Sequence, residues 1–214
     1  MENSEKSVPG GPDRAGAGSG ARCAGILLTG GASRRMGRDK ASILVGAGAG
    51  AVSLAERTAG LLEAVAAPVV EVGSGRSGRW SVREDPPGGG PLAAAAAGWS
   101  ALSERGWRGP VLLVATDLPR LSVGLLEWLA RHPSDRSVVP VAGDRVQPLC
   151  ARYRPADLDR AVGLVAAGRR AMADLLAAVD PLLVAHHDWA GPAGDPAALD
   201  DVDTPADLER LTRS

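Results

Sequence analysis

The segment Ala24-Gly-Ile-Leu-Leu28 runs without a break into Thr29-Gly-Gly31, and this junction decides how the chain folds. A short apolar run that stops at a glycine turn is typical of a strand buried on both faces. The run Val111-Leu-Leu-Val-Ala115 repeats the pattern and ends in Thr116-Asp117-Leu118-Pro119. Buried strands of this kind belong to parallel sheets, which hold ligands at the carboxyl ends of their strands. We therefore expect a binding site where these two strands end.

Helix-like and strand-like segments alternate along the rest of the chain. Helices are expected over 53–65 and 91–102, from about residues 156 and 171, and at the end of the chain with Thr204 as N-cap. Strands are expected over 68–72, 138–141, 149–153 and 182–185, with a Gly143-Asp144 turn that makes a hairpin of the middle two. The alternation predicts an α/β fold, with helices on both faces of a mostly parallel sheet.

The composition indicates a globular protein without a strong overall charge. Its 214 residues include 24 Lys+Arg and 25 Asp+Glu, a formal net charge of −1, and only 3% are aromatic. Such a chain lacks the positive field and the aromatic platforms that nucleic-acid binding uses. It also lacks an apolar run long enough to cross a bilayer. We expect no nucleic-acid partner, no membrane partner and a cytoplasmic location.

Residues 1–21 mix Gly, Pro, Ser and scattered charges without an apolar period, which predicts a disordered tail before one domain over 22–214. Cys23 and Cys150 are too few for a disulfide framework or a four-ligand zinc site, and are expected to be buried hydrophobic residues. The histidines show no catalytic or metal-binding spacing. No protein nucleophile can be recognised in the sequence.

Glycines and cations gather in the segment that follows the first strand, 27–40. Gly30 and Gly31 allow a close approach of the backbone to a ligand, and Arg34, Arg35, Arg38 and Lys40 follow within one loop. This combination suits a polyphosphate, although a solvated basic loop after an ordinary turn is the alternative. The Walker pattern fails because Gly37 is followed by Arg38-Asp39, which disfavours a P-loop ATPase.

Two carboxylates follow predicted strands. Asp117 stands after the strand 111–115, where it can hold Mg²⁺ together with substrate phosphates, or can simply form the turn. Asp85 lies in the Gly/Pro-rich segment 83–92, where three glycines indicate a close passage of the backbone past a ligand; a solvated Asp85 is the alternative.

The order of these motifs resembles the molybdenum cofactor guanylyltransferases of the nucleotidyltransferase superfamily. The signature is Leu28-Thr-Gly-Gly-x-Ser-x-Arg-Met-Gly-x-Asp-Lys40, and the later motifs follow it through essentially everything after Arg22. They are Glu84-Asp85 with Gly90-Pro-Leu92, Thr116-Asp-Leu-Pro119, Gln147-Pro-Leu149, Gly168-Arg-Arg-Ala-Met172 and Asp201-Val-Asp-Thr-Pro-Ala-Asp-Leu208. The resemblance implies a three-layer, Rossmann-like fold of the nucleotide-diphospho-sugar transferase type.

The resemblance also implies a site and a reaction. Leu28, Thr29, Gly30, Gly31, Lys40, Asp85 and Asp117 would bind the nucleotide, Asp117 would bind Mg²⁺, and Lys40, Arg35 and Asp117 would be catalytic. The reaction would transfer GMP from GTP to molybdenum-molybdopterin and release pyrophosphate. Partners would be GTP, the molybdopterin-type acceptor, and molybdoenzymes or other cofactor-biosynthesis proteins.

Two classes of alternative stay open. One is a sister nucleotidyltransferase that uses CTP on the same pterin, or GTP on another phosphorylated precursor. The other is a non-catalytic nucleotide or cofactor carrier. The chain also departs from the family pattern, because Gly73 stands after the second strand where an Asn is often found. A side-chain amide is a natural reader of guanine, so the residue that selects the base is not given by the resemblance.

Overall fold

The structure is a computed structural model that describes residues 23–30, 40–45, 51–85 and 87–200. The predicted tail 1–21 and the helix expected at Thr204 lie outside these residues, so both stay predictions. Within the described ranges, no helix has both the length and the apolar character needed to cross a membrane.

An eight-stranded sheet forms the centre of the fold. Its strand order is β10-β7-β9-β6-β1-β4-β5, with β8 paired to β7. Its centre is parallel: β1 (Ala24–Leu28) lies between β6 (Val111–Ala115) and β4 (Val69–Val72), and β5 (Ser81–Val82) follows at the edge. The two runs that predicted buried strands are therefore neighbours. Every residue of β1 and β6 is buried, as expected for strands covered on both faces.

The other half of the sheet is mixed. β9 (Cys150–Tyr153) runs antiparallel to β6 and to β7 (Val138–Ala142), while β10 (Leu182–Val184) is parallel to β7. The Gly143-Asp144 turn joins β7 to β8 (Arg145–Val146), a two-residue strand with exposed side chains that has no apolar pattern to reveal it. The predicted hairpin thus forms with β8, and 150–153 pairs mainly with β6.

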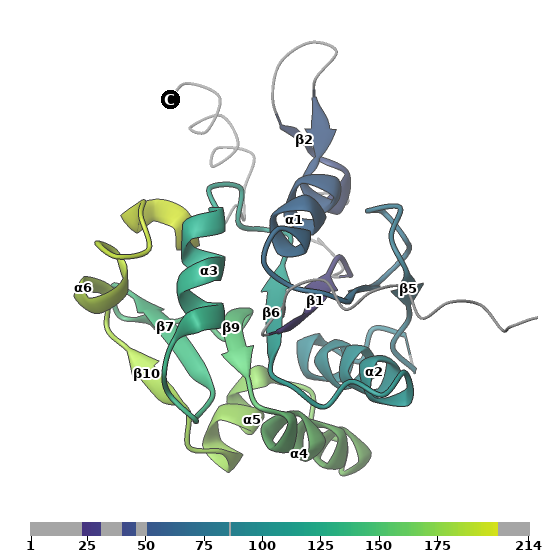
Figure 1. Ribbon diagram of the computed structural model, residues 1–214. Coiled ribbons are helices and arrows are strands. Elements are labelled where there is room, and N and C mark those ends of the chain that lie inside the picture. Colours follow the sequence, from purple (N-terminus) through teal and green to yellow (C-terminus); the bar gives the residue numbers. More distant parts are fainter. Residues whose placement is uncertain (1–22, 31–39, 46–50, 86, 201–214) are drawn as a thin grey trace, which may run out of the picture.

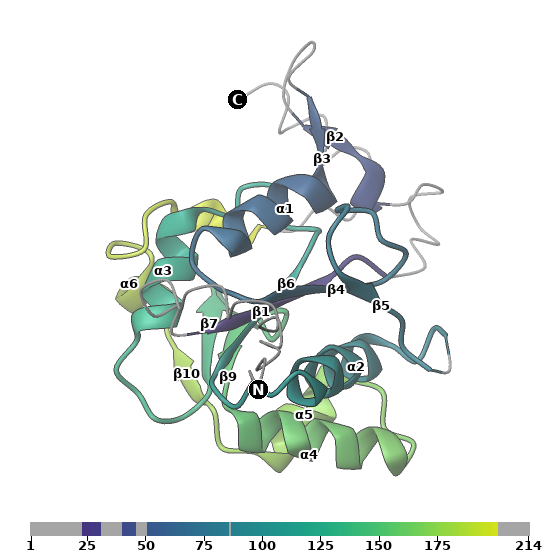
Figure 2. The same cartoon turned by 45° about the vertical axis from the view of Figure 1, so that its right-hand side comes forward.

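Helices cover both faces of this sheet (Figures 1 and 2). One face carries α1 (Leu54–Glu63), α3 (Val123–Arg131) and α6 (His186–Trp189), whose buried residues join one core cluster. The other face carries α2 (Pro91–Glu104), α4 (Pro155–Ala166) and α5 (Met172–Ala178), which build a second cluster. The sheet and the helices on each of its two faces therefore form three layers, as expected.

The strands supply both clusters by alternation. Ile26 and Leu28 of β1 pack toward α2, whereas Cys23 and Leu27 pack toward α1 and α3. Both cysteines are fully buried thiols, as predicted. Small residues bring α2 close to the sheet: a Cβ placed on Gly98 would be 2.8 Å from Ile26 Cγ2.

Local sequence explains where α1 begins. Ser53 is its N-cap and accepts a hydrogen bond from the Glu56 backbone N–H, while the Glu56 carboxylate accepts from the Ser53 N–H, a complete capping box. Before it stand the short helix η1 (Lys40–Ser42) and a two-stranded ribbon of β2 (Leu44–Val45) and β3 (Val52–Ser53). The ribbon stands apart from the main sheet, beyond the N-terminal end of α1 (Figure 2).

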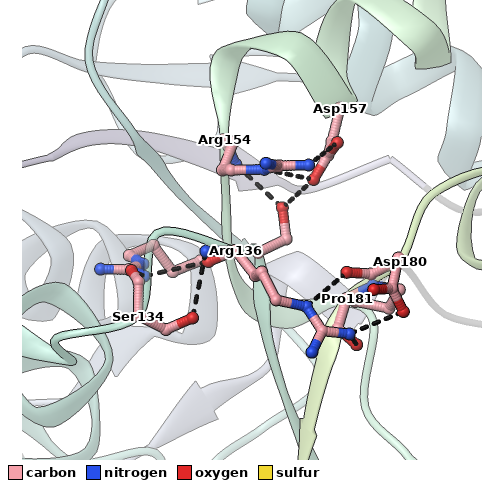
Figure 3. A network of polar contacts seen from close by, with 8 residues as sticks. Ser134, Arg136, Arg154, Asp157, Asp180 and Pro181 are labelled. Carbon is pink, nitrogen blue, oxygen red and sulfur yellow. Dashed lines mark hydrogen bonds and ion pairs between the residues drawn. The ribbon is translucent and has the colours of Figure 1, made fainter.

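A polar network stabilises the start of β7. It lies on the side of the sheet where β1 and β6 begin, opposite to their carboxyl ends. The buried hydroxyl of Ser137 donates to Asp157 Oδ2 at 2.5 Å, and Arg154 forms an ion pair with the same carboxylate. Arg136 reaches Asp180 and the Pro181 carbonyl, which fixes the approach to β10 (Figure 3). This network joins secondary structure elements at the amino ends of the central strands, away from the predicted site at their carboxyl ends.

Candidate nucleotide site

Four of the predicted site residues, Leu28, Thr29, Gly30 and Asp117, lie at or directly after the carboxyl ends of the neighbouring strands β1 and β6. Leu28 is aligned with Ala115 of β6 on one side and with Val72 of β4 on the other. The Thr116 N–H donates to the Leu28 carbonyl at 3.2 Å, and the Thr29 N–H donates to the Val72 carbonyl at 3.1 Å. Main-chain hydrogen bonds therefore bring the segments after these three strands side by side.

Thr29 and Gly30 directly follow β1, at the carboxyl ends of these strands. Thr29 is only 8% exposed, whereas Gly30 is exposed. The Thr29 hydroxyl donates to Glu71 Oε1 at 2.5 Å, so its side chain is turned into the protein. Of the two described residues of this turn, Thr29 and Gly30, only Gly30 is exposed to solvent.

Glu71 is a buried carboxylate in the middle of an apolar strand. It is 0% exposed and lies on β4 beside Leu27 of β1. Its Oε1 accepts from the backbone N–H groups of Gly75 and Arg76, both at 2.8 Å, in addition to the Thr29 hydroxyl. Its Oε2 accepts from the N–H of Ser77 at 2.8 Å and from the Ser77 hydroxyl at 2.6 Å. Five donors therefore satisfy this one carboxylate.

These contacts decide the charge state of Glu71. Burial on its own raises the pKa of the carboxyl, because it disfavours the charged form. The hydrogen bonds from Ser77, Thr29 and the turn favour the carboxylate and outweigh burial, so the net pKa lies below the ordinary value. Glu71 is consequently an anion at neutral pH, and it ties the turn after β4 to the end of β1.

Asp117 lies one residue beyond Thr116 and is half-buried. Burial first, and the negative charge of Asp117 second, raise the pKa of the Cys150 thiol to about 12. The thiol therefore stays protonated and is no nucleophile. Asp117 therefore lies two residues after the end of β6, close enough to Cys150 for its charge to act on that thiol.

The acidic pair after β5 lies at the other side of the site. Asp85 is exposed, whereas Glu84 is half-buried and its Oε1 accepts from the Gly88 N–H at 3.2 Å. A Cβ placed on Gly30 would be 3.9 Å from Glu84 Oε2. Among the described residues of this segment, Glu84 rather than Asp85 therefore approaches the turn after β1.

The basic residues are described only in part. Lys40 begins η1, and the contacts between η1 and α1 set its main chain on the same side of the sheet as α1. Gly31 and Arg35 lie outside the described residues, as does Asp201, so their places in the site stay predictions. The site seen here consists of the strand ends and the turns that follow them.

The chemistry of the carboxylates fits a magnesium ion shared with a substrate. Within the described ranges no three His, Cys, Asp or Glu side chains gather as a metal cage. Mg²⁺ does not need one, because it usually takes one or two carboxylates and completes its shell with water and phosphate oxygens. Asp117, half-buried after β6, is a carboxylate of the kind that this coordination uses.

A family model matches residues 25–187 of the chain, and its description is "MobA-like NTP transferase domain". This match covers both halves of the sheet and all the strand ends described above. The chain belongs to the MobA-like NTP transferase family. The resemblance found in the sequence is thereby confirmed, and the protein is a nucleotidyltransferase by family.

Relatives of known name agree with this assignment. Over 172 residues the chain is 38% identical to a probable molybdenum cofactor guanylyltransferase of Mycobacterium tuberculosis, covering 77% of this chain and 84% of the relative. A protein of the same name from Mycobacterium marinum is 33% identical over 197 residues, or 89% of this chain and 93% of the relative. The similarity therefore covers 84% of the first relative and 93% of the second.

Solved structures show the same fold. Molybdopterin-guanine dinucleotide biosynthesis protein A from Archaeoglobus fulgidus superposes with a TM-score of 0.71 at 21% identity, covering 88% of this chain and 96% of the other. A 2-C-methyl-D-erythritol 4-phosphate cytidylyltransferase from Thermus thermophilus gives 0.60 at 21% identity, with 88% and 98% coverage. The nucleotide-diphospho-sugar transferase-like α/β fold is thus confirmed.

Sequence reasoning missed the part that Glu71 plays. The signal was present, because a carboxylate stands between Val70 and Val72 at a position where both faces of a strand are covered. A charge at such a position must be satisfied by several donors, and glycine-rich turns supply backbone N–H groups. The segment Gly73-Ser-Gly75 directly after it is such a turn.

Proposed function

We propose that the chain transfers GMP from GTP to the terminal phosphate of a molybdopterin-type cofactor. An oxygen of the acceptor phosphate attacks the α-phosphorus, the bond between the α-phosphorus and its bridging oxygen to the β-phosphate breaks, and pyrophosphate leaves. The protein supplies no nucleophile, so its work is positioning and charge stabilisation.

The observation that carries this proposal is the juxtaposition of the Thr29-Gly30 turn and Asp117 at neighbouring strand ends, in a member of a nucleotidyltransferase family. The main chain of Leu28, Thr29, Gly30 and Gly31 would line the nucleotide. Lys40 and Arg35 would neutralise the charge that moves onto pyrophosphate, and Asp85 would contact the nucleotide. Curated relatives named as guanylyltransferases support GTP as the donor.

Asp117 would hold Mg²⁺ together with phosphate oxygens. When bound, the ion would neutralise part of the triphosphate charge. Asp117 itself would fix where that positive charge lies relative to the Gly30 main chain, and its own half-buried position would keep bulk water from screening it.

The direct test is pyrophosphate release from GTP, CTP, ATP and UTP with purified molybdenum cofactor as acceptor, followed by mass spectrometry of the product. We expect release only with the acceptor, a preference for GTP and a guanine dinucleotide product. A preference for CTP would indicate the sister transferase instead. Tight GTP binding with no release under any condition would indicate a carrier.

A further inference from the structure

No side chain follows β4 at the position where the resemblance would place an amide, because Gly73 stands there. A Cβ on Gly73 would fall closer to Thr29 Oγ1 than Cβ atoms come to other atoms in real structures. The Thr29 hydroxyl stays in this space because it donates to Glu71 Oε1. A residue that selects the base therefore has to lie at another strand end beside the proposed nucleotide site.

Glu84 lies at such a strand end. β5 is parallel to β4, with Val82 aligned to Val72, and the Gly73 N–H donates to the Val82 carbonyl at 2.9 Å. The end of β5 is thus one strand away from β1, with β4 between them (Figure 2). The side chain of Glu84, two residues after β5, comes back toward β1: a Cβ placed on Gly30 would be 3.9 Å from Glu84 Oε2.

The two oxygens of the Glu84 carboxylate differ in their partners. Oε1 accepts from the Gly88 N–H at 3.2 Å, which orients the side chain from within its own segment. Within the described ranges, Oε2 takes part in no hydrogen bond and in no ion pair. Gly30 is exposed and has no side chain that could cover this oxygen. A ligand lying against Gly30 can therefore reach a carboxylate oxygen that still lacks a donor.

The charge of this carboxylate limits which part of a nucleotide can lie against it. Asp85 directly follows Glu84, and neither of them forms an ion pair with a residue that the structure describes. Two neighbouring anions repel a triphosphate. An uncharged nucleoside does not meet this repulsion, and its hydrogen-bond donors are attracted to an anion. The Glu84 end of the site therefore suits the nucleoside rather than the phosphates.

Guanine is the base whose donors match a carboxylate. Its N1–H and its N2 amino group are adjacent donors, and an ionised carboxylate is an acceptor only. Cytosine has one amino group beside the lone pair of N3, and this lone pair would face the anion. A site built to hydrogen-bond one group rejects an analogue that lacks it, because its own polar atom is then left without a partner. A carboxylate at this position thus favours guanine over cytosine.

We propose that Glu84 selects the base: its Oε2 accepts hydrogen bonds from the N1–H and the N2 amino group of guanine, a task that no side chain at position 73 can perform. This inference rests on the proposed function, since it assigns the base reader of the same nucleotide site. Glu84 contacts the substrate directly, next to Asp85, to which the resemblance assigns nucleotide binding.

The test separates the base from the phosphates. Glu84→Gln keeps the size of the side chain and an oxygen that can accept from the Gly88 N–H, but it removes the charge and replaces one acceptor by a donor. We expect the Kd for GTP, measured by calorimetry without acceptor, to rise about tenfold and the GTP-to-CTP ratio of kcat/KM to fall about fivefold or more. The Kd values for CTP and for inorganic tripolyphosphate should stay within about twofold.

Inosine triphosphate provides a measurement that needs no variant. It keeps the N1–H of guanine and lacks only the N2 amino group, so the wild type should bind it about fivefold more weakly than GTP. In Glu84→Gln this difference should largely disappear. Glu84→Asp keeps the charge on a shorter side chain and should retain part of the preference for GTP. Glu104→Gln changes an exposed carboxylate at the end of α2 and is the matched control, with all these quantities unchanged.

Three results would overturn the role of Glu84. Equal weakening of GTP and CTP binding in Glu84→Gln would indicate a contact with the ribose, and equal weakening of tripolyphosphate as well would indicate a structural role. An unchanged GTP-to-CTP ratio in the folded variant would remove Glu84 from base selection. Failure of the proposed function has a different signature, because a wild type that releases no pyrophosphate can still lose its preference for GTP binding in Glu84→Gln.

Discussion

Gly73 and Thr29 share one space: the hydroxyl oxygen of Thr29 occupies the position that a Cβ on Gly73 would need. The two residues lie 44 positions apart and meet because β1 and β4 are paired in parallel. Glu71 determines which of them fills the space, since its carboxylate accepts the Thr29 hydroxyl at 2.5 Å. A substitution at either position therefore changes what the other can tolerate.

The first prediction is a coupling between these positions. Gly73→Asn alone should destabilise the protein by about 2–3 kcal/mol, as overpacking of a close contact does. Thr29→Ala should remove the clash, so the double variant should be more stable than the sum of the two single changes by roughly 1–2 kcal/mol. Urea unfolding of the four proteins measures this cycle. Additive free energies would show that the two side chains do not compete.

The second prediction concerns the dependence of stability on pH. The folded-state pKa of Glu71 lies below its ordinary value, so its carboxylate stabilises the fold fully above about pH 4.5 and loses this effect as the pH falls through the folded pKa. Glu71→Gln leaves a buried donor unpaired and should cost on the order of 2 kcal/mol at pH 7. The difference between wild type and variant should shrink below pH 4.5. Unfolding free energies that differ equally at pH 7 and pH 4 would contradict this.

Most of the fold follows from patterns that a sequence displays. The buried runs at 24–28 and 111–115, the Pro91 start of α2 and the strands at 69–72 and 138–142 all lie where apolar periodicity and turn residues place them. Helix α3 was not expected, although Ser122 caps it and Leu125, Leu126 and Leu129 have helical spacing. The strands β2, β3, β5 and β8 are each two residues long, which is too short for an apolar alternation to appear in the sequence.

The candidate site was predictable only where one residue carries the chemistry. The positions of Gly30 and Asp117 after buried strands could be predicted because those strands are recognisable in the sequence. The Glu71–Thr29–Gly73 relationship could not, because it depends on which strands pair and in what register. A short sequence window contains no information about a contact between segments more than 40 residues apart, so this relationship emerges only from the folded chain.

The third prediction tests how α2 lies on the sheet. A methyl group on Gly98 would be 2.8 Å from Ile26 Cγ2 and 3.0 Å from Val72 Cγ2, so Gly98→Ala should destabilise by about 1–2 kcal/mol despite the better helix propensity of alanine. Gly163 of α4 has nothing within 4 Å of such a methyl group, so Gly163→Ala should stabilise by about 0.5–1 kcal/mol. Thermal unfolding compares the two. A stabilised Gly98→Ala variant would show looser packing under α2.

The fourth prediction concerns Lys40, which begins η1 after the glycine-arginine loop. As a point charge near phosphates, it should contribute to triphosphate binding and to the transfer step. Lys40→Ala should raise the KM for GTP and lower kcat, each by about tenfold, which corresponds to about 1.4 kcal/mol. Thermal stability should not change. Unaltered steady-state kinetics would show that Lys40 is a solvated residue, and a loss of stability would give it a structural role.

The last prediction concerns Asp117 at the end of β6. Asp117→Asn keeps the size of the side chain and much of its turn-forming ability, but removes the charge that would hold Mg²⁺. Because a bound metal supplies several kcal/mol of charge stabilisation, the rate of transfer should fall on the order of 100-fold or more. High magnesium should restore part of the loss by mass action.

The same substitution should lower the pKa of the buried Cys150 thiol slightly, since the charge of Asp117 contributes to raising it. A magnesium titration of pyrophosphate release, run on both proteins, measures the main effect. Superimposable titration curves and equal rates would remove Asp117 from the metal site.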